Sequence, residues 1–280
     1  MIKRILKANK YSSIHLLEGP STPLAFLRIS FAFISWQKYC DYFLYHRKLD
    51  KILEKSIEIF GQLNFTQELF VALIYLFICI FFQISFSGML FGFKSKFFTC
   101  CLGIIAFSIY FIDPHHHTFL LSCILIILSF SNIDKSFSID SRGNYKSVNV
   151  SYAPLAMLCV LNSSVYFWSA TDKLFSIDFL SGNRLEALFW QYWPGSSFEQ
   201  TSLFDLSLVA ISLVIIIIQY LLAFGLWNKK LFFPIVIIGF ILHIMMYLAL
   251  PIGPFSIIMW LLYYVFYLVR FKSILPIKCK

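Results

Sequence analysis

Charged side chains are scarce in this chain of 280 residues: they make up 13% of it, against 59% hydrophobic and 19% aromatic residues. A soluble domain of this length carries about 25% charged residues. The shortage argues against a soluble enzyme, and the net charge of +9 then reflects basic loops beside a membrane rather than a nucleic-acid partner. Lipid is predicted to be the solvent for most of the chain.

The sequence also lacks the paired cysteine spacing of a zinc site or of a disulfide framework. Its seven cysteines lie mostly inside apolar runs, where a thiol behaves as a small hydrophobe. Three consecutive histidines at 115–117 point about 100° apart on a helix, which makes a poor metal triad, so no metal is expected. A basic N-terminus is present without a short apolar stretch and cleavage site after it, so no removable signal peptide is expected.

Long apolar runs are what the chain has instead. A helix needs about 20 mostly apolar residues to cross the hydrocarbon core of a bilayer. The predicted fold is all-α, a polytopic membrane helix bundle of about eight transmembrane helices in a single domain over 1–280, with its core at about 22–271. The predicted spans are 24–44, 66–91, 97–112, 117–131, 152–171, 204–227, 231–250 and 254–270.

Lysine and arginine are divided unequally between the two sides of such a bundle. Fifteen fall in the two tails and in the loops of one side, and six fall in the opposite loops. Cytoplasmic loops of membrane proteins carry the excess of these residues. Both termini are therefore predicted to be cytoplasmic, and the histidine turn, Lys173 and the turn at 251–254 are predicted to share the outer face.

Polar side chains occupy one face of the fifth predicted span. Four of them follow one another at intervals of four, three and four residues: Asn162, Tyr166, Ser169 and Lys173. This spacing forms one stripe on a helix, and polar groups in lipid need partners, so the stripe is expected to face the bundle interior. Two interpretations of Lys173 stay open: an amine that reaches the outer interface beside Asp172, or a poorly hydrated amine that acts as a base.

Other ionisable residues lie inside or beside the spans. His243 lies about two turns inside the seventh span. It either forms a structural hydrogen bond between helices or belongs to a functional site. Arg28, near the cytoplasmic end of the first span, is expected to extend to the interface. His117 is expected to point inward, while His115 and His116 stay at the interface. An amphipathic helix in 174–203 either roofs a pocket near Lys173 or rests on the bilayer.

Five motifs follow one another over about 240 residues: "PLAFLRISFAF" (23–33), "FIDPHHHTFLL" (111–121), "SFSID" (136–140), "VYFWSATDKLFSIDFLSG" (165–182) and "LHIMMYLALPIGPFSIIM" (242–259). In this order they resemble the HTTM family, the transmembrane module of the vitamin K-dependent gamma-carboxylases and their bacterial relatives. The resemblance places Lys173 on the family's lysine, His117 on its histidine and His116 in the usual place of an asparagine. The groups expected at the ligand are His116, His243, Tyr166 and Ser169. The other motif positions are Arg28, Asp113, Asp140, Asp178 and Gly253.

The chemistry of the carboxylases is implied by this resemblance. There the matching lysine deprotonates vitamin K hydroquinone, whose oxidation by oxygen drives removal of a substrate proton before carbon dioxide is added. The resemblance implies a bacterial plasma-membrane enzyme, a carboxylase or epoxidase of the carbon–carbon lyase or oxidoreductase type. Its cofactor would be a reduced quinone of the vitamin K or menaquinol type, with Lys173 as base near the outer face. A dry pocket makes an amine an effective base.

The chain departs from the family pattern at four motif positions: His116, Ala170, Phe179 and Gln219. No large domain follows the eighth span, where the carboxylases capture their peptide, so peptide carboxylation by this chain alone is not expected. The resemblance also covers short HTTM proteins that help mature sporulation-delaying antimicrobial peptides. The alternative function is therefore a non-enzymatic membrane partner in the maturation or export of a small secreted peptide. A transporter is disfavoured because no internal repeat is apparent.

Overall fold

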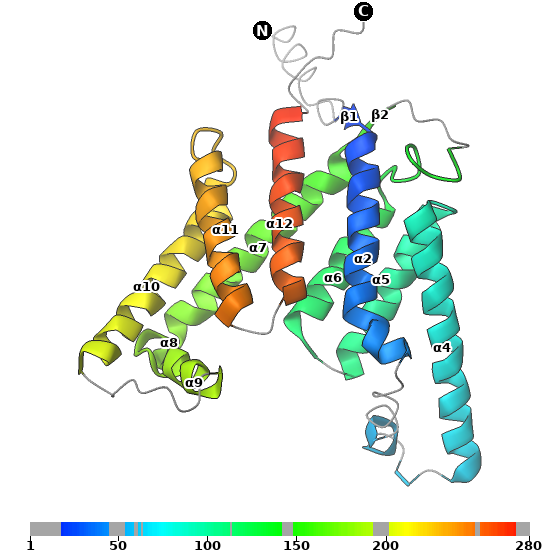
Figure 1. Ribbon diagram of the computed structural model, residues 1–280, viewed down its shortest axis with the longest axis horizontal. Helices are drawn as coiled ribbons and strands as arrows, with labels where there is room; N and C mark the ends of the chain where they lie inside the picture. The colour runs from blue at the N-terminus through cyan, green and yellow to red at the C-terminus, as the bar shows by residue number, and fades with distance from the viewer. Residues whose placement is uncertain are drawn as a thin grey trace, which may run out of the picture. The chain divides into compact units, whose positions relative to one another are not determined.

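The architecture is almost entirely helical in the computed structural model of the chain (Figure 1). The chain divides into two compact units, which are described separately: unit 1 is Met1–Met157 with Tyr267–Lys280, and unit 2 is Leu158–Phe266. The structure describes residues 18–44, 54–58, 61–62, 64–112, 114–141, 148–192, 202–249 and 253–272.

Eight helices correspond to the eight predicted spans, and each end lies within four residues of the predicted one. The all-α prediction is therefore confirmed. The helices are α2 (Thr22–Leu44), α4 (Phe65–Phe91), α5 (Ser95–Ile112), α6 (His116–Ser129), α7 (Ala153–Phe175), α10 (Ser202–Gly225), α11 (Phe232–Ala249) and α12 (Gly253–Tyr267). A π-helical turn, η3 (Leu268–Lys272), continues α12.

Five of these helices are long and apolar enough to cross a membrane by length and composition: α4, α5, α7, α10 and α12 with its continuation. Helices α6 and α11 are apolar but shorter. With 14 residues, α6 covers about 21 Å, less than the about 30 Å of a hydrocarbon core. Helix α2 is long but less apolar, because Arg28 and Lys38 lie within it. Among the residues that the structure describes, the number of spans by this measure is below the predicted eight.

Apolar side chains on the outer faces of these helices point to lipid as the surrounding solvent. In α4 only 22% of the most apolar stretch is buried within the chain. Phe65 is 80% exposed and Phe77 is 68% exposed. Such long rows of exposed apolar side chains are unfavourable in water and ordinary in a bilayer. The helical bundle with its several candidate spans fits an integral membrane protein.

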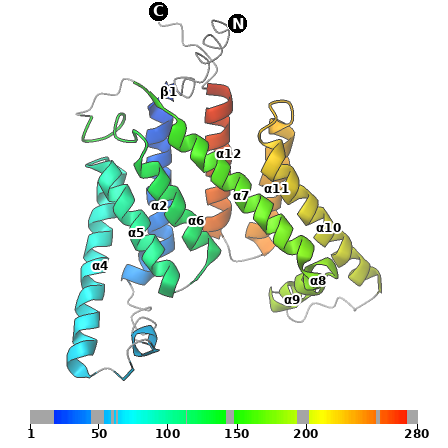
Figure 2. The ribbon, with the colours of Figure 1, turned by 180° about the vertical axis from the view of Figure 1, so that it is seen from behind.

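Unit 1 is built on four helices, α2, α4, α5 and α6, which lie side by side in Figures 1 and 2. Helix α4 begins with a reciprocal cap in which Asn64 and Gln67 exchange side-chain and backbone hydrogen bonds. The pair α5–α6 packs closely because Gly103 leaves room for Ile126, with the Ser122 hydroxyl donating to the Gly103 carbonyl at 2.8 Å. Small residues at a helix contact are the usual device for packing in lipid.

A short antiparallel ribbon lies before α2 and before α7. Strand β1 (Glu18–Pro20) pairs with β2 (Asn149–Ser151), with Glu18 opposite Ser151. The Tyr152 hydroxyl donates to the Pro20 carbonyl at 2.8 Å. These bonds fix two segments that are about 130 residues apart in the chain.

Arg28 holds the loop that follows α6. Its side chain is 0% exposed and donates from Nη1 to the Ile133 carbonyl at 3.0 Å and from Nη2 to the Phe137 carbonyl. Asp134 and Asp140 lie close enough to act on its charge. The guanidinium is therefore enclosed by the protein and held by two backbone carbonyls, whereas its extension to the membrane interface stays a prediction.

In unit 2, α7 is followed by two short helices, α8 (Ile177–Leu180) and α9 (Asn183–Tyr192), which contact α10 (Figure 1). The Ser176 side chain caps α8 by accepting from the Phe179 amide. Helix α9 lies within the predicted amphipathic segment. Helices α10 and α11 lie side by side in both ribbon views.

Gly92 provides a test of the Arg28 junction. It has φ +73° at the end of α4, and a Cβ there would lie 2.3 Å from Arg28 Nη1. We expect Gly92→Ala to lower the free energy of unfolding by about 2 kcal/mol more than Gly61→Ala. Gly61 is the matched control, with φ +81° but nothing within 4 Å of its added Cβ. Thermal unfolding in detergent measures both, and equal losses would contradict the close packing of Arg28 against Gly92.

Candidate functional site

A chain of hydrogen bonds joins three helices in the interior of unit 2. The Tyr166 hydroxyl on α7 bonds to His243 Nε2 on α11 at 2.7 Å and also to the Tyr263 hydroxyl on α12. All three side chains are buried, at 1–3% exposure. Polar side chains in an apolar bundle are costly unless they are paired, so this cluster, the Tyr166 cluster, holds the three helices in register.

The neighbouring residues shape this cluster. A Cβ at Gly239 would lie 2.4 Å from the Tyr263 hydroxyl, so only glycine allows Tyr263 to approach α11 this closely. The Ser256 hydroxyl donates to the His243 carbonyl at 3.1 Å. Phe240 and Trp260 stack with ring centroids 4.5 Å apart. These contacts hold α11 and α12 together on both sides of the His243 imidazole.

Several buried polar atoms of unit 2 have no hydrogen-bond partner among the described residues. His243 Nδ1 is one, and both amide atoms of Asn162 and the Gln219 Oε1 are others. Asn162 lies one turn before Tyr166 on α7 and is 0% exposed. Unpaired buried polar groups are rare in folded proteins and mark places where a ligand or water completes the bonding.

Lys173 lies at the end of the same stripe of α7. Its Nζ donates to the Ser169 hydroxyl at 2.6 Å and to the Ser169 carbonyl at 3.2 Å. It also lies 5.5 Å from the centre of the Phe179 ring. Lys173 forms no ion pair with any described residue, and Asp172 is exposed. The amine is therefore half-buried beside an aromatic ring, and the Asp172 carboxylate acts on it only from beyond ion-pair distance.

The polar stripe predicted on α7 lies partly in the interior. Asn162 and Tyr166 are buried, whereas Ser169 and Lys173 are half-buried. Lys173 is roughly 10 Å along the helix axis from Tyr166. Within the described residues no hydrogen bond connects Lys173 to His243, so the amine and the imidazole that bonds to Tyr166 lie at different levels along α7.

The predicted residues in front of α6 belong to unit 1. His116 is exposed and His117 is half-buried, and the His117 ring stacks on that of His115 with centroids 5.2 Å apart. Because Lys173 and His243 belong to unit 2, a shared site of these residues with His117 stays a prediction. Asp113 lies outside the described residues. In the part of the chain that the structure describes, no group of three or more His, Cys, Asp or Glu side chains could hold a metal ion.

The remaining motif residues have separate places. Arg28 lies in the buried junction of unit 1, with Asp140 in the loop that it holds. Asp178 is an exposed residue in the first turn of α8. Gly253 is the first residue of α12. None of these four residues touches the Tyr166 cluster through a described hydrogen bond.

Sequence reasoning missed Tyr263 and Ser256. Tyr263 occurs in "WLLYYVFYLV", where tyrosines alternate with apolar residues and nothing distinguishes a bonded hydroxyl from an aromatic core residue. A usable signal is the glycine at 239, opposite Tyr263 on α11, but this pairing depends on how the two helices are aligned.

Comparison with known protein families, with characterised proteins and with solved structures finds no match to this chain. The assignment to the HTTM family therefore stays a prediction from the order of its motifs.

The Tyr166 hydroxyl can be tested by its removal. Tyr166→Phe leaves His243 Nε2 and the Tyr263 hydroxyl without their shared partner, so we expect a loss of about 1–3 kcal/mol of stability. Tyr220→Phe is the matched control, because the Thr171 hydroxyl that Tyr220 contacts keeps its bond to the Phe167 carbonyl. Its loss should be below about 1 kcal/mol. Denaturant unfolding in micelles measures both variants, and a smaller loss for Tyr166→Phe than for the control would contradict this assignment.

Proposed function

We propose that this chain is an integral membrane protein that binds a reduced quinone in unit 2 and accepts a proton from it at Lys173. It would thus be a quinol-dependent enzyme of the gamma-carboxylase-like type. The observation that supports this proposal is the buried Tyr166 cluster, which ends in an imidazole nitrogen without a described partner. An ionisable side chain in the interior of a membrane bundle indicates a functional site by default.

The residues fit a hydroquinone by their chemistry. A hydroquinone ring needs apolar walls and hydrogen-bond partners for its two hydroxyl groups. His243 Nδ1 offers such a partner, and the Phe255 ring lies beside the imidazole with centroids 5.6 Å apart. The cluster contains no carboxylate that would oppose the formation of an anionic ligand. When bound, a hydroquinone supplies two electrons and two protons for the reaction.

The direction of the hydrogen bonds in the Tyr166 cluster determines whether His243 Nδ1 is a donor or an acceptor. If the Tyr166 hydroxyl donates to Nε2, the neutral imidazole carries its proton on Nδ1 and donates to a ligand oxygen. If the Tyr166 hydroxyl donates to Tyr263 instead, Nε2 donates to Tyr166 and Nδ1 becomes an acceptor. The same three side chains can therefore bind a hydroxyl group in one state and a carbonyl group in the other.

Lys173 has the surroundings of a base. The Ser169 hydroxyl and carbonyl position Nζ, and the Phe179 ring excludes water from one side of it. Burial of Nζ beside this ring opposes the ammonium form, and the Asp172 carboxylate counteracts this effect only from beyond ion-pair distance. An amine of this kind accepts a proton at Nζ from a weakly acidic hydroxyl group.

The experiment is quinol oxidation by membranes that contain the full chain. We expect oxygen-dependent oxidation of menaquinol or vitamin K hydroquinone, and Lys173→Ala should reduce its rate by about 10²–10⁴-fold because the base is removed. Lys230→Ala is the matched control: it removes an exposed lysine in the turn between α10 and α11 and should leave the rate unchanged.

Equal turnover by the Lys173→Ala and wild-type proteins would remove the proposed role of Lys173. The absence of any quinol oxidation by the wild-type protein, together with identification of a different lipophilic molecule in purified protein by mass spectrometry, would overturn the choice of ligand.

A further inference from the structure

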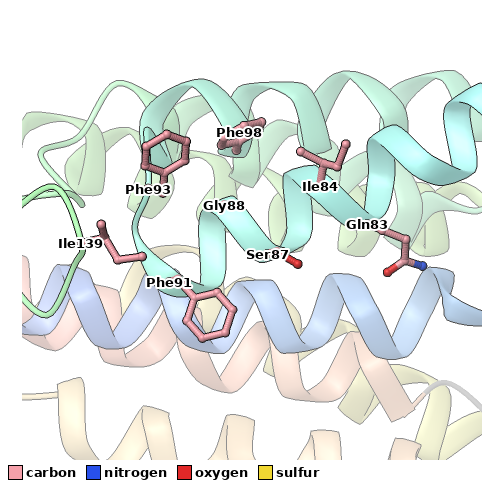
Figure 3. A pocket seen from close by; sticks show the side chains of 8 residues that line it. All are labelled: Gln83, Ile84, Ser87, Gly88, Phe91, Phe93, Phe98 and Ile139. Atoms are coloured by element: carbon pink, nitrogen blue, oxygen red, sulfur yellow. The ribbon is translucent and has the colours of Figure 1, made fainter.

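Two adjoining hollows lie on the surface of unit 1 at the turn between α4 and α5. The first, of about 480 Å³, is apolar and follows α4 from Gln83 to Phe91 (Figure 3). The second, of about 490 Å³, is lined by charged side chains of the turn and of the loop after α6. Phe93 and Phe98 line both hollows. Together they form one site with an apolar end and a polar end.

The apolar end is shaped to hold a hydrocarbon chain. Gly88 lies in its wall, and a Cβ there would be 2.1 Å from the Phe98 ring, so the ring packs directly against the α4 backbone. Figure 3 shows Phe93 and Phe98 on one side of this groove, with Ile84 further along α4. Ile84 is 50% exposed and Phe91 is 60% exposed, although both are apolar. A groove of this kind on a candidate span faces lipid acyl chains.

The polar end presents one positive and one negative charge that are not compensated within it. Lys96 donates to the Asn132 side chain at 2.7 Å and forms an ion pair with Asp134 at 3.9 Å, so its charge is balanced, although Asp134 Oδ1 accepts no hydrogen bond from a described residue. Lys94 and Asp140 also line this hollow, and neither forms an ion pair with a described residue. Two opposite charges at one site match a zwitterion better than a simple anion or cation.

Ser95 adds a hydrogen-bond donor between these charges. It is the first residue of α5, is 0% exposed and lines the polar hollow. Its hydroxyl has no hydrogen-bond partner among the described residues. The first turn of an α-helix also presents unpaired backbone amides, which favour phosphate groups. A phosphate at this position would satisfy the buried hydroxyl and meet the Lys94 amine.

We propose that this site binds one zwitterionic aminophospholipid, of the phosphatidylethanolamine type. Its phosphate lies at Lys94 and Ser95, its ammonium group at Asp140, and an acyl chain in the groove between Phe91 and Ile84. The turn that carries Lys94 joins two candidate spans, which places the polar end at the depth of lipid headgroups. An anionic phospholipid without an amine would instead bring its negative charge next to the Asp140 carboxylate, which forms no ion pair with a described residue and is affected by Arg28 only at longer range.

The test uses the full chain purified in a mild detergent. Dioleoyl phosphatidylethanolamine and dioleoyl phosphatidylglycerol are added in equal amounts, and native mass spectrometry measures how much of each stays bound. We expect retention of one phosphatidylethanolamine with a preference of about fivefold, the size of one headgroup charge interaction. Soluble phosphoethanolamine should not displace it, because the groove would then be empty. A wild-type preference for phosphatidylglycerol, or displacement by phosphoethanolamine, would overturn the proposal.

Three substitutions separate the parts of the site. Lys94→Gln should lower retention of phosphatidylethanolamine about fivefold. Asp140→Asn should reverse the preference toward phosphatidylglycerol, because the positive charge stays and the opposing carboxylate is gone. Ser87→Trp should block the groove and lower retention of both lipids, because Ser87 lines its apolar wall.

Two controls outside the site match the lysine and the tryptophan substitutions. Lys230→Ala removes an exposed lysine in unit 2, and Ser108→Trp adds the same ring to an exposed position on α5. Thermal unfolding establishes that every variant keeps its fold. Equal lipid retention by the folded site variants and by these controls would refute the site.

Discussion

Water is absent from the hydrocarbon core of a bilayer, so each polar side chain within a helix bundle must find its partner in the protein. A buried polar group without one costs several kcal/mol. Arg28 meets this requirement with its two terminal nitrogens, which donate to two carbonyls of the loop after α6, while its Nε has no described partner. Tyr166 satisfies it by bonding to side chains from two other helices. These bonds, together with close glycine contacts such as that of Gly103 with Ile126, determine which segments of each unit pack together.

The Arg28 junction and the Tyr166 cluster differ in how many hydrogen-bond arrangements they can adopt. Backbone carbonyls only accept hydrogen bonds, so the Arg28 junction has one bonding arrangement and acts as a fixed brace. Hydroxyl and imidazole groups both donate and accept, so the Tyr166 cluster has more than one arrangement of its protons. Chemistry that moves protons requires the second kind of network. This difference is the physical reason for placing the proposed reaction in unit 2.

The helices were predictable because their signal is local. Apolar length alone located all eight, and the largest boundary error, at the end of α7, arose because Asp172 and Lys173 suggested an earlier end. The helix continues through them because Lys173 bends back to Ser169 on the preceding turn. The stripe on α7 was also predictable, since helical periodicity places its members on one face.

The partners of these residues were not predictable from the sequence. Arg28 binds carbonyls that are more than one hundred residues away in the chain. Because every residue has a backbone carbonyl, no residue type in the sequence identifies these two partners. Tyr263 depends on the alignment of α11 with α12, which a single sequence does not contain. Lys94 and Asp140 stand out as the two charges without an ion pair only when the structure shows that Lys96 bonds to Asn132. Long-range pairing, rather than local propensity, determines these sites.

The ribbon of β1 and β2 has a consequence for how unit 1 is threaded through a membrane. Paired strands lie on one side of the bilayer, so the chain between them crosses an even number of times. The α4–α5 turn meets the loop after α6 through the bond from the Ile139 amide to the Phe91 carbonyl, and Arg28 joins that loop to the first part of α2. All four helices therefore have one end in a common layer and alternate in direction. If α4 and α5 traverse the bilayer, α4 begins and α5 ends on the side opposite the ribbon, so the less apolar α2 must cross to reach α4 and the shorter α6 must cross to return.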